Sequence, residues 1–589
     1  MRQVKIWPVL VGLALLGAAA LIWSMPRGAG LDYDSPFYLT AAENLRNGRG
    51  LYWEGEGGQL FPLLHYPPLY SMVLAFLISM GLDSVSAAAC VNIACFAGTV
   101  GLTGWVIYHF TRQAWVSVAG SLTALVSPIL IGVHLEALSE PLFLVLLIGS
   151  LGLLAEDLRR ARTGILITSA AVAGLAYLTR YVGLAVVVTG GWAILADRRR
   201  DLGRRLRDTA VFGGASLLPV LVWYVRNWAL TRSLANRAIY FHPPTVDSLR
   251  LGVFTLTGWL SLDCLPFRGG PVLVLVIGVA LALLTGWAWV RSNRPAGEMA
   301  AGGDSRRASL EAAAILVLFA CAYCGLLLAS LSFFDAATKL DNRILSPAYV
   351  VVLIAFWLIV ASIPRPARMA LTGAAAVLVA SYLVRSVGLL EEMRLNGRGF
   401  NNRQWETSET IAWLRAQPDG GILYTNEPFP VRFLTGRSVY WVPEAFDPVQ
   451  RRQRPGFEAQ MEAMRSRLRQ PGSVLALFTA RLASPEFPSE AEITEGLVVL
   501  AQTSDGVIYV DPGNLPLLEQ AQVGLLGNTM TRPHGPACSC VSMGHASVLL
   551  RKRPSLAWSL SSDVPASGGW LAVRLFSGAF PSADVSGIG

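Results

Sequence analysis

Long apolar runs, each nearly free of charge and separated by short polar gaps, dominate the first two thirds of this 589-residue chain. A run of about 20 apolar residues is long enough to cross the hydrocarbon core of a bilayer as a helix. Backbone groups in that core need internal hydrogen bonds, which a helix supplies. Counting such runs predicts about eleven transmembrane helices, at about 6–25, 85–110, 114–134, 137–154, 163–179, 180–196, 209–229, 270–291, 310–332, 344–363 and 368–388.

The composition favours a polytopic membrane protein and excludes a soluble globule, because 53% of the residues are hydrophobic, 15% are charged and the mean hydropathy is +0.48. The net charge of +9 would suggest nucleic acid in a soluble protein. Here, however, the arginines gather in short gaps between apolar runs, as expected of cytoplasmic loops. We therefore expect no nucleic-acid partner, an N-terminus on the cytoplasmic side of the cytoplasmic (plasma) membrane, and a C-terminus on the other side after an odd number of spans.

The composition divides the chain into three parts. Residues 1–390 form the predicted transmembrane domain, whose first outer loop at 26–66 precedes a short apolar helix at 67–81 that opens with two prolines. Residues 391–513 are more polar and contain the short apolar stretches "GILYTN", "SVYWVP", "SVLALFTA" and "GVIYV", which predict a small extracytoplasmic α/β domain. Residues 514–589 lose periodicity and are rich in Gly, Ser and Pro, which predicts a poorly ordered tail.

Two carboxylates, Asp32 and Asp34, stand at the start of the first outer loop, within a turn of the membrane surface. A carboxylate beside hydrocarbon is costly unless it is solvated, paired or used. Ser35 is expected to cap the helix that follows and Pro36 to be its first residue, with one apolar face on the membrane. In a purely structural interpretation Asp34 stabilises that helix start through the helix dipole. In a functional interpretation it faces a lipid-attached substrate.

Five short motifs follow one another along the first 390 residues: "DSPFYLTAAENLRNGRG" from Asp34 to Gly50, then "YPPLY", "SEPLF", "WYVRN" and "NRILSP". In order, spacing and sidedness they resemble the GT-C superfamily of polytopic membrane glycosyltransferases that use polyprenyl-phosphate sugars. Protein mannosyltransferases, aminoarabinose transferases and rhizobial lipopolysaccharide transferases belong to it. The resemblance implies a GT-C-like helical membrane domain and a glycosyltransferase of the cell envelope.

In that family an aspartate of the first outer loop is the catalytic carboxylate, and Asp34 matches its position. The resemblance implies an inverting displacement, in which Asp34 accepts the acceptor's proton as general base while the polyprenyl phosphate leaves. The departing phosphate needs fixed cations, for which the planar guanidinium of arginine is well suited. The candidates for donor phosphate binding, near the outer ends of spans, are Arg226, Arg343, Lys339, Arg180 and His65.

Competing interpretations and departures from the family pattern limit these assignments. Arg226 could equally anchor a helix end by snorkelling, and Arg343 has an aspartate two residues earlier with which a local ion pair could form. Ser35 stands where many members have a second acidic residue. The aminoarabinose branch has a Glu-Lys pair before the double proline, where this chain has His65 and Tyr66, so the phosphate-binding lysine of that branch has no counterpart here.

Asp32, Glu136 and Glu140 are secondary acidic candidates. Ser139 is expected to cap the helix that starts at Glu140, so a structural role is favoured for Glu140, whereas Glu136 could help to hold a substrate or a metal. The seven cysteines show no metal-ligand spacing with histidine. We therefore assign no metal ligands and no certain cofactor, and the need for a divalent cation stays open.

The expected partners are a polyprenyl-phosphate sugar donor, membrane lipids and an acceptor that could be a lipid, a polysaccharide or a protein. The alternative from another class is a lipid or solute transporter, such as a flippase. A transporter should carry polar groups or broken helices at mid-membrane depth, whereas the predicted spans are mostly uninterrupted and carry their charges at the outer ends. A non-catalytic scaffold would leave the charged residues at one face unexplained.

Overall fold

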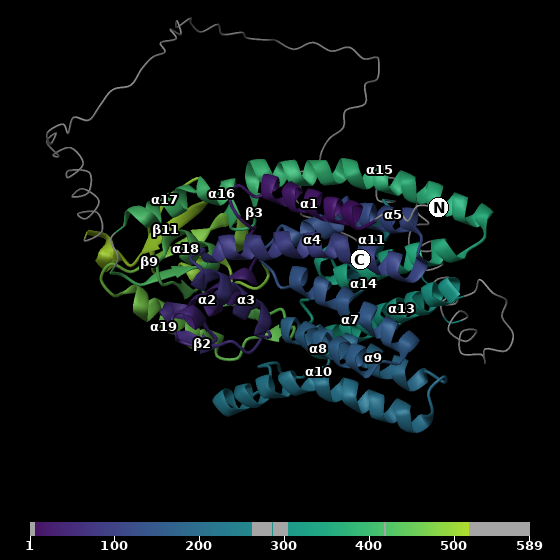
Figure 1. Ribbon diagram of the computed structural model, residues 1–589. Helices are drawn as coiled ribbons and strands as arrows, with labels where there is room; N and C mark the ends of the chain where they lie inside the picture. The colour runs from purple at the N-terminus through teal and green to yellow at the C-terminus, as the bar shows by residue number, and fades with distance from the viewer. Residues whose placement is uncertain (1–5, 262–277, 279–285, 287–303, 418–419, 517–589) are drawn as a thin grey trace, which may run out of the picture. The chain divides into compact units, whose positions relative to one another are not determined.

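A computed structural model describes residues 6–261, 278, 286, 304–417 and 420–516. Within these residues, seven helices are long and apolar enough to cross a membrane, and each coincides with a predicted span. The chain is therefore a multi-pass helical membrane protein, as predicted (Figure 1). The seven are α1 (Ile6–Ser24), α4 (Ser84–Thr111), α7 (Glu140–Arg160), α10 (Leu202–Thr231), α13 (Asp304–Phe333), α14 (Asn342–Ser362) and α15 (Arg365–Asn396).

Two predictions fall on other parts of the chain. The predicted span at 270–291 lies outside the described residues except for positions 278 and 286, and the predicted tail at 514–589 lies outside them after residue 516. Between α10 and α13, the structure also describes a shorter helix, α11 (Val246–Gly258).

The segment predicted as one span at 114–134 is a broken helix. It consists of α5 (Ala114–Leu125) and α6 (Pro128–His134), whose axes differ by 54°. Pro128 has no N–H with which to continue the helical ladder, and the Ser127 hydroxyl caps α6 by accepting a 3.3 Å hydrogen bond from the Leu130 amide. The expectation of an uninterrupted helix is corrected for this segment.

The predicted spans at 163–179 and 180–196 correspond to shorter helices, α8 (Thr163–Thr179) and α9 (Leu184–Ala196). Between them, Arg180 has an extended backbone (φ −148°, ψ 136°), and a 3-10 turn follows at Tyr181–Gly183. In the sequence, Arg180 and Tyr181 interrupt the apolar residues between these two predicted spans, and the structure has its break at the same place.

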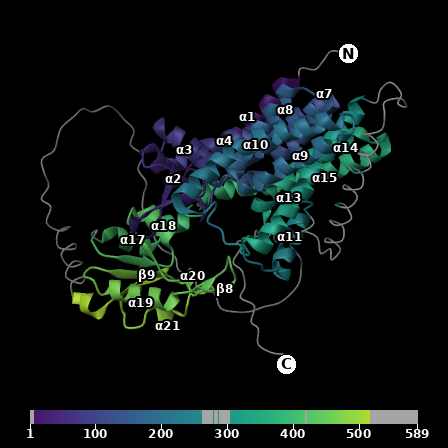
Figure 2. The ribbon, with the colours of Figure 1, turned by 90° about the horizontal axis from the view of Figure 1, so that it is seen from below.

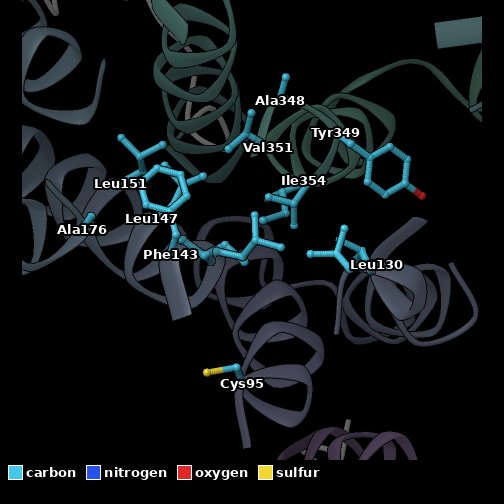
Figure 3. Close-up of a cluster of buried hydrophobic side chains, with 14 of the residues drawn as sticks. Cys95, Leu130, Phe143, Leu147, Leu151, Ala176, Ala348, Tyr349, Val351 and Ile354 are labelled. Carbon is cyan, nitrogen blue, oxygen red and sulfur yellow. The ribbon is translucent and has the colours of Figure 1, made fainter. Parts of the chain in front are cut away.

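The membrane helices enclose a continuous apolar core and expose apolar side chains on the outside. On α10, Leu218 and Val222 are each 64% exposed, and on α15, Val377 is 73% and Val384 is 74% exposed. Such surfaces are stable against lipid and costly against water. Helices α4, α6, α7, α8 and α14 meet in the core, and the residues labelled there in Figure 3 are Cys95, Leu130, Phe143, Leu147, Leu151, Ala176, Ala348, Tyr349, Val351 and Ile354.

The first loop has its own secondary structure: α2 (Ser35–Arg46), an antiparallel hairpin of β1 (Tyr52–Glu54) and β2 (Leu60–Pro62), and α3 (Leu69–Ser79). With 11 residues, α3 is too short to span, as predicted. Ser35 is the first residue of α2 and does not cap it; its hydroxyl accepts a 2.9 Å hydrogen bond from the Asp32 amide. Leu39 and Asn44 are also buried, although they lie beside the apolar face that was expected on the membrane. They are covered because α3 and β1 pack against α2.

After α15 the chain forms the predicted α/β fold around a five-stranded sheet (Figure 2). The order is β10-β11-β9-β5-β6, in which β5 is parallel to β9 and β6, and β11 is antiparallel to β9 and β10. The four stretches quoted above supply four of these strands. The bounds are β5 (Leu423–Thr425), β6 (Tyr440–Trp441), β9 (Val474–Phe478), β10 (Val498–Gln502) and β11 (Gly506–Val510).

Both faces of this sheet are covered by helices. On one face, α17 (Glu409–Ala416) and α18 (Pro428–Thr435) supply Ile411, Leu414 and Val431 to a core cluster. On the other, α19 (Phe457–Leu468) and α21 (Glu490–Ile493) supply Met461, Met464, Leu468 and Ile493. All five residues of β9 are buried, as expected for a central strand covered on both faces. The smaller elements are α16 (Arg403–Glu406), α20 (Thr479–Leu482), and the short strands β3 (Gly397–Arg398), β4 (Asn401–Asn402), β7 (Phe446–Asp447) and β8 (Arg452–Gln453).

Candidate active site

The two aspartates of the first loop follow a short extended segment that is held on both sides by distant parts of the chain. The Gly30 amide donates to the Leu135 carbonyl at 2.8 Å. On the other edge, the Leu31 amide donates to the Arg398 carbonyl at 3.3 Å, and the Phe400 amide donates back to Leu31 at 2.8 Å. Residues before α7 and after α15 thus fix the direction in which the chain enters α2.

We expect Gly399→Ala to reduce activity at least tenfold and to lower the melting temperature, because a Cβ at this position would lie 1.8 Å from the Leu31 carbonyl oxygen. The clash would displace the segment that carries the two aspartates. The matched control is Gly436→Ala, which has a similar positive φ (72° against 59°) but open space around its Cβ. The control should show only the strain of a left-handed alanine, about 1–2 kcal/mol. Equal losses in both variants would contradict the role of the clash.

Arg343 is the centre of an ion-pair cluster that the sequence did not predict. At the start of α14, its guanidinium contacts Asp34, donates to Asp32 at 3.0 Å and donates to Glu140 at 2.7 Å. Glu140, whose side chain is 1% exposed, also pairs with Arg180 at 2.5 Å. Buried charges need partners, and these two arginines and three carboxylates supply them for one another.

Two polar side chains complete this cluster. The Tyr66 hydroxyl donates a 2.7 Å hydrogen bond to Asp34. Ser139 makes no cap for α7; its hydroxyl instead contacts the Tyr38 hydroxyl at 3.0 Å and accepts from Arg180 at 3.2 Å. The expectation of a Ser139 cap is therefore corrected, because a buried hydroxyl and a guanidinium compete for its oxygen.

Asp34 is ionised in this environment. Burial raises the pKa of its carboxyl, but the charge and hydrogen bond of Arg343 and the hydrogen bond of Tyr66 outweigh burial and hold the pKa below its ordinary value of 3.8. At neutral pH the carboxylate can accept a proton, as a general base must.

A cavity of about 980 Å³, which we call the charged cavity, opens beside the cluster. Its lining comes from loops at the ends of membrane helices and from the α/β domain. Three further cations line it that the sequence analysis did not select, namely Arg237, Arg398 and Arg454. The sequence-predicted residues in its lining are Asp32, Asp34, His65, Glu136, Arg180, Lys339 and Arg343, while Glu140 lies behind Arg343.

Arg226 is not part of this cavity lining. Its guanidinium donates to the backbone carbonyls of Leu63 at 3.2 Å and Leu51 at 3.1 Å, and lies 4.7 Å from the centre of the Trp223 ring. Its donors hold the first loop against α10, which favours the anchoring interpretation for this residue.

Glu136 and His65 line the charged cavity, and the pKa of each side chain is shifted from its ordinary value. Burial raises the pKa of Glu136, which pairs with Arg398 at 2.6 Å. Burial, followed by the charge of Arg237, lowers the pKa of His65 below 6.5, so its imidazole is neutral at pH 7 and offers hydrogen bonds and no charge.

The α/β domain contacts the aspartate segment through Tyr33. The Tyr33 hydroxyl donates to the Glu427 carboxylate at 3.0 Å and accepts from Arg481 at 3.2 Å. Burial raises the pKa of Glu427. Glu427 lies in "YTNEP", outside the five family motifs. No sequence spacing links it to Tyr33. It supports the residue between Asp32 and Asp34 from a distance of almost 400 positions.

The donor set does not fit a divalent-cation site. No group of three or more His, Cys, Asp or Glu side chains within the described residues is arranged to hold a metal ion. In the acidic cluster, the Arg343 guanidinium lies where the oxygens of Asp32, Asp34 and Glu140 converge. Those oxygens are already engaged by a fixed cation of the chain itself.

Several solved structures are similar to this chain. A crystal structure of an oligosaccharyltransferase from Archaeoglobus fulgidus, in complex with Zn and sulfate, matches 85% of this chain and 73% of its own with a TM-score of 0.50 and 10% identity. ArnT from Cupriavidus metallidurans, bound to undecaprenyl phosphate, matches 86% of this chain and 98% of its own with a TM-score of 0.46 and 15% identity. The arabinofuranosyltransferase AftD from Mycobacteria matches 86% and 40% with a TM-score of 0.42 and 14% identity.

No protein-family model and no curated protein matches the chain. The fold predicted from the five motifs is nevertheless confirmed by the oligosaccharyltransferase, whose similarity extends over most of the described residues. The chain therefore shares its fold with this oligosaccharyltransferase, and an α/β domain follows its last described membrane helix.

Proposed function

We propose that this protein is a glycosyltransferase of the cell envelope that transfers a sugar from a polyprenyl-phosphate donor to an acceptor, with inversion at the anomeric carbon. The observation that carries the proposal is an ionised carboxylate, Asp34, in the wall of a large charged cavity at the ends of membrane helices. A lipid-linked donor can reach such a site with its chain in the bilayer and its sugar phosphate in water.

The distribution of arginine supports an extracytoplasmic site in the cytoplasmic (plasma) membrane. The described loops on the side opposite to the charged cavity are short, and arginines gather in them and at the adjoining helix ends, for example Arg160, Arg198 and Arg365. Loops of this kind face the cytoplasm under the positive-inside rule. With α1 starting from that side, the N-terminus is cytoplasmic, and the charged cavity and the α/β domain are extracytoplasmic.

The proposed step is a single displacement. A hydroxyl or amine of the acceptor attacks the anomeric carbon on the side opposite to the phosphate, the bond from that carbon to the phosphate oxygen breaks, and the electron pair leaves with the polyprenyl phosphate. Asp34 takes the proton of the attacking group. Arg343 and Tyr66 orient the Asp34 carboxylate for this transfer through the hydrogen bonds described above.

Cations of the charged cavity would bind the donor phosphate. Arg343 and Arg180 are already compensated by carboxylates, and Arg237 has only a loose contact of 3.8 Å with Asp335. Lys339 lines the same cavity, is exposed, and has no carboxylate within ion-pair distance among the described residues. Lys339 and Arg237 are therefore the cations that can most readily turn to a phosphate.

We expect Lys339→Ala to raise the KM for a polyprenyl-phosphate sugar about tenfold, because a charge-assisted hydrogen bond to the phosphate is lost. Lys339→Arg should keep the KM within about threefold of the parent protein, since it retains the charge. Initial rates over a range of donor concentrations measure both. Arg469→Ala, an exposed cation of the α/β domain outside the charged cavity, is the matched control. An unchanged KM in Lys339→Ala would remove Lys339 from the phosphate site.

A further inference from the structure

A second cavity, of about 490 Å³, lies between the hairpin of the first loop and the α/β domain, and we call it the aromatic cavity. Four aromatic rings line it: Trp53 on β1, Phe61 on β2, Tyr424 on β5 and Trp441 on β6. The Trp53 and Phe61 rings are stacked with centroids 5.4 Å apart, and the Trp53 and Trp441 rings are 6.5 Å apart. Phe61 is 39% exposed and the two indoles are half-buried, so aromatic surface is left in contact with water unless a ligand covers it.

The two walls of the aromatic cavity are joined by hydrogen bonds. The Gly57 amide of the hairpin donates to the Val439 carbonyl at 2.9 Å, and the Trp441 amide donates to the Glu56 carboxylate at 3.1 Å. The hairpin is therefore attached to the edge of the sheet at β6, and the aromatic cavity is a built feature of the fold.

Planar polar groups stand beside the rings. Glu56, Gln460 and Arg467 line the aromatic cavity and are exposed, and Arg467 donates a 3.2 Å hydrogen bond to the Tyr424 hydroxyl. Carboxylate, amide and guanidinium groups each offer two hydrogen-bonding positions in one plane. Adjacent hydroxyls of a sugar fit such groups, while the C–H face of a sugar ring packs flat against an indole.

The lining also argues against a lipid chain or a polyanion as the occupant. No lining residue belongs to a described membrane-spanning helix, so the aromatic cavity opens away from hydrocarbon. Its two carboxylates, Glu56 and Glu444, balance two guanidiniums, Arg454 and Arg467. A neutral, hydroxyl-rich ligand matches this balance.

The aromatic cavity adjoins the site of transfer. Arg454 lines both the aromatic cavity and the charged cavity. An extended ligand that rests on Trp53 and Trp441 can therefore continue past Arg454 toward Asp34. An enzyme that acts on the terminal residue of an extended ligand requires this arrangement.

We propose that the aromatic cavity binds the acceptor and that the acceptor is a saccharide chain, whose sugar rings stack on Trp53 and Trp441 and whose terminal residue enters the charged cavity. The inference rests on the proposed function for its link to catalysis, but the binding of a saccharide stands on the aromatic cavity alone.

The test is binding of the purified full-length protein, in detergent, to a printed array of neutral and acidic oligosaccharides. We expect a subset of neutral glycans to retain the parent protein, and Trp441→Ala to weaken that binding at least tenfold. Ala463→Trp, at an exposed position of α19 in the lining, should fill the aromatic cavity and have the same effect without removing any core side chain. Phe433→Ala is the control, because it removes a ring that is 40% exposed and lines neither cavity.

Retention of no glycan by the parent, or equal retention by the parent, Trp441→Ala and Ala463→Trp, would overturn the inference. Retention of peptides and no glycan on a parallel peptide array would replace the saccharide with a protein acceptor and also overturn it. Because the array contains no donor, its outcome is separate from that of the proposed function. Glycan binding without sugar transfer would contradict the proposed transferase activity and support the saccharide site. Sugar transfer without glycan binding would support the transferase activity and contradict the saccharide site.

Discussion

Asp34→Asn should reduce the rate of sugar transfer by about 10²–10⁴-fold, the usual contribution of a general base. The amide has the shape of the carboxylate and can still accept a hydrogen bond from Tyr66 or Arg343, but it cannot take a proton from the acceptor. The melting temperature should therefore change little. Transfer of label from a radiolabelled polyprenyl-phosphate sugar measures the rate, and thermal unfolding in detergent measures the stability.

Asp32→Asn is the control for this variant, since Asp32 shares the contact with Arg343 and stands two residues earlier. We expect a smaller loss of rate there, because only Asp34 holds the position that the family motif gives to the base. Equal rates in Asp34→Asn and the parent protein would remove the catalytic assignment. An equal loss in both variants would assign the effect to the charge of the cluster and not to one base.

Arg343→Ala should be the most destabilising of the substitutions considered, by about 3–5 kcal/mol, the usual consequence of removing one partner from a buried ion pair. Glu140, with its side chain 1% exposed, would keep only Arg180, and Asp32 and Asp34 would lose their shared cation. Activity should fall as well, because the orientation of Asp34 depends on the same guanidinium. Chemical unfolding in detergent and the transfer assay measure the two effects.

Arg343→Lys should recover only part of the loss, because a lysine ammonium cannot contact three carboxylates in the geometry of a planar fork. Arg465→Ala is the matched control for stability, since Arg465 pairs at 2.7 Å with a Glu495 side chain that is 70% exposed. That surface pair should contribute at most about 1 kcal/mol. A similar small change in Arg343→Ala would contradict the account of the cluster.

Much of the fold could be predicted because the features that specify it are local. Apolar runs of spanning length identified the membrane helices, and the arginine at position 180 marked a break that the structure confirms. The break between α5 and α6 was missed although "SP" at Ser127 and Pro128 is a helix-start signal. The continuous hydrophobicity of 114–134 obscured it.

Individual residues of the candidate site could be predicted from the sequence, but the contacts between them could not. The motifs selected Asp34 and Arg343 separately, but 309 positions separate them along the chain, and no local pattern indicates that they meet. For the same reason a local ion pair with the aspartate two residues before Arg343 stood as the competing interpretation. In the structure that residue, Asp341, caps α14 by accepting from the Ile344 amide at 3.0 Å, which leaves Arg343 free to contact the first loop.

For Arg226, the sequence left two roles open. Its place near a helix end suited a phosphate ligand equally well, but two carbonyls of the first loop occupy its donors. The Leu51 carbonyl also accepts from the Leu63 amide, and sequence alone does not show which cation adds a second hydrogen bond to such a carbonyl. Tyr66 and Arg454 were not selected as site residues, because the hydrogen bond of Tyr66 to Asp34 and the position of Arg454 beside two cavities exist only in the folded chain.

The most direct test of the central claim is sugar transfer by the purified, detergent-solubilised protein, with a panel of radiolabelled polyprenyl-phosphate sugars as donors and membrane extract as acceptor. The account predicts that label from at least one donor moves to an acceptor and that Asp34→Asn reduces the rate of this transfer by about 10²–10⁴-fold. If the protein consumes no donor and instead carries the lipid-linked sugar across the membrane of reconstituted liposomes, the protein is a transporter and the account is wrong.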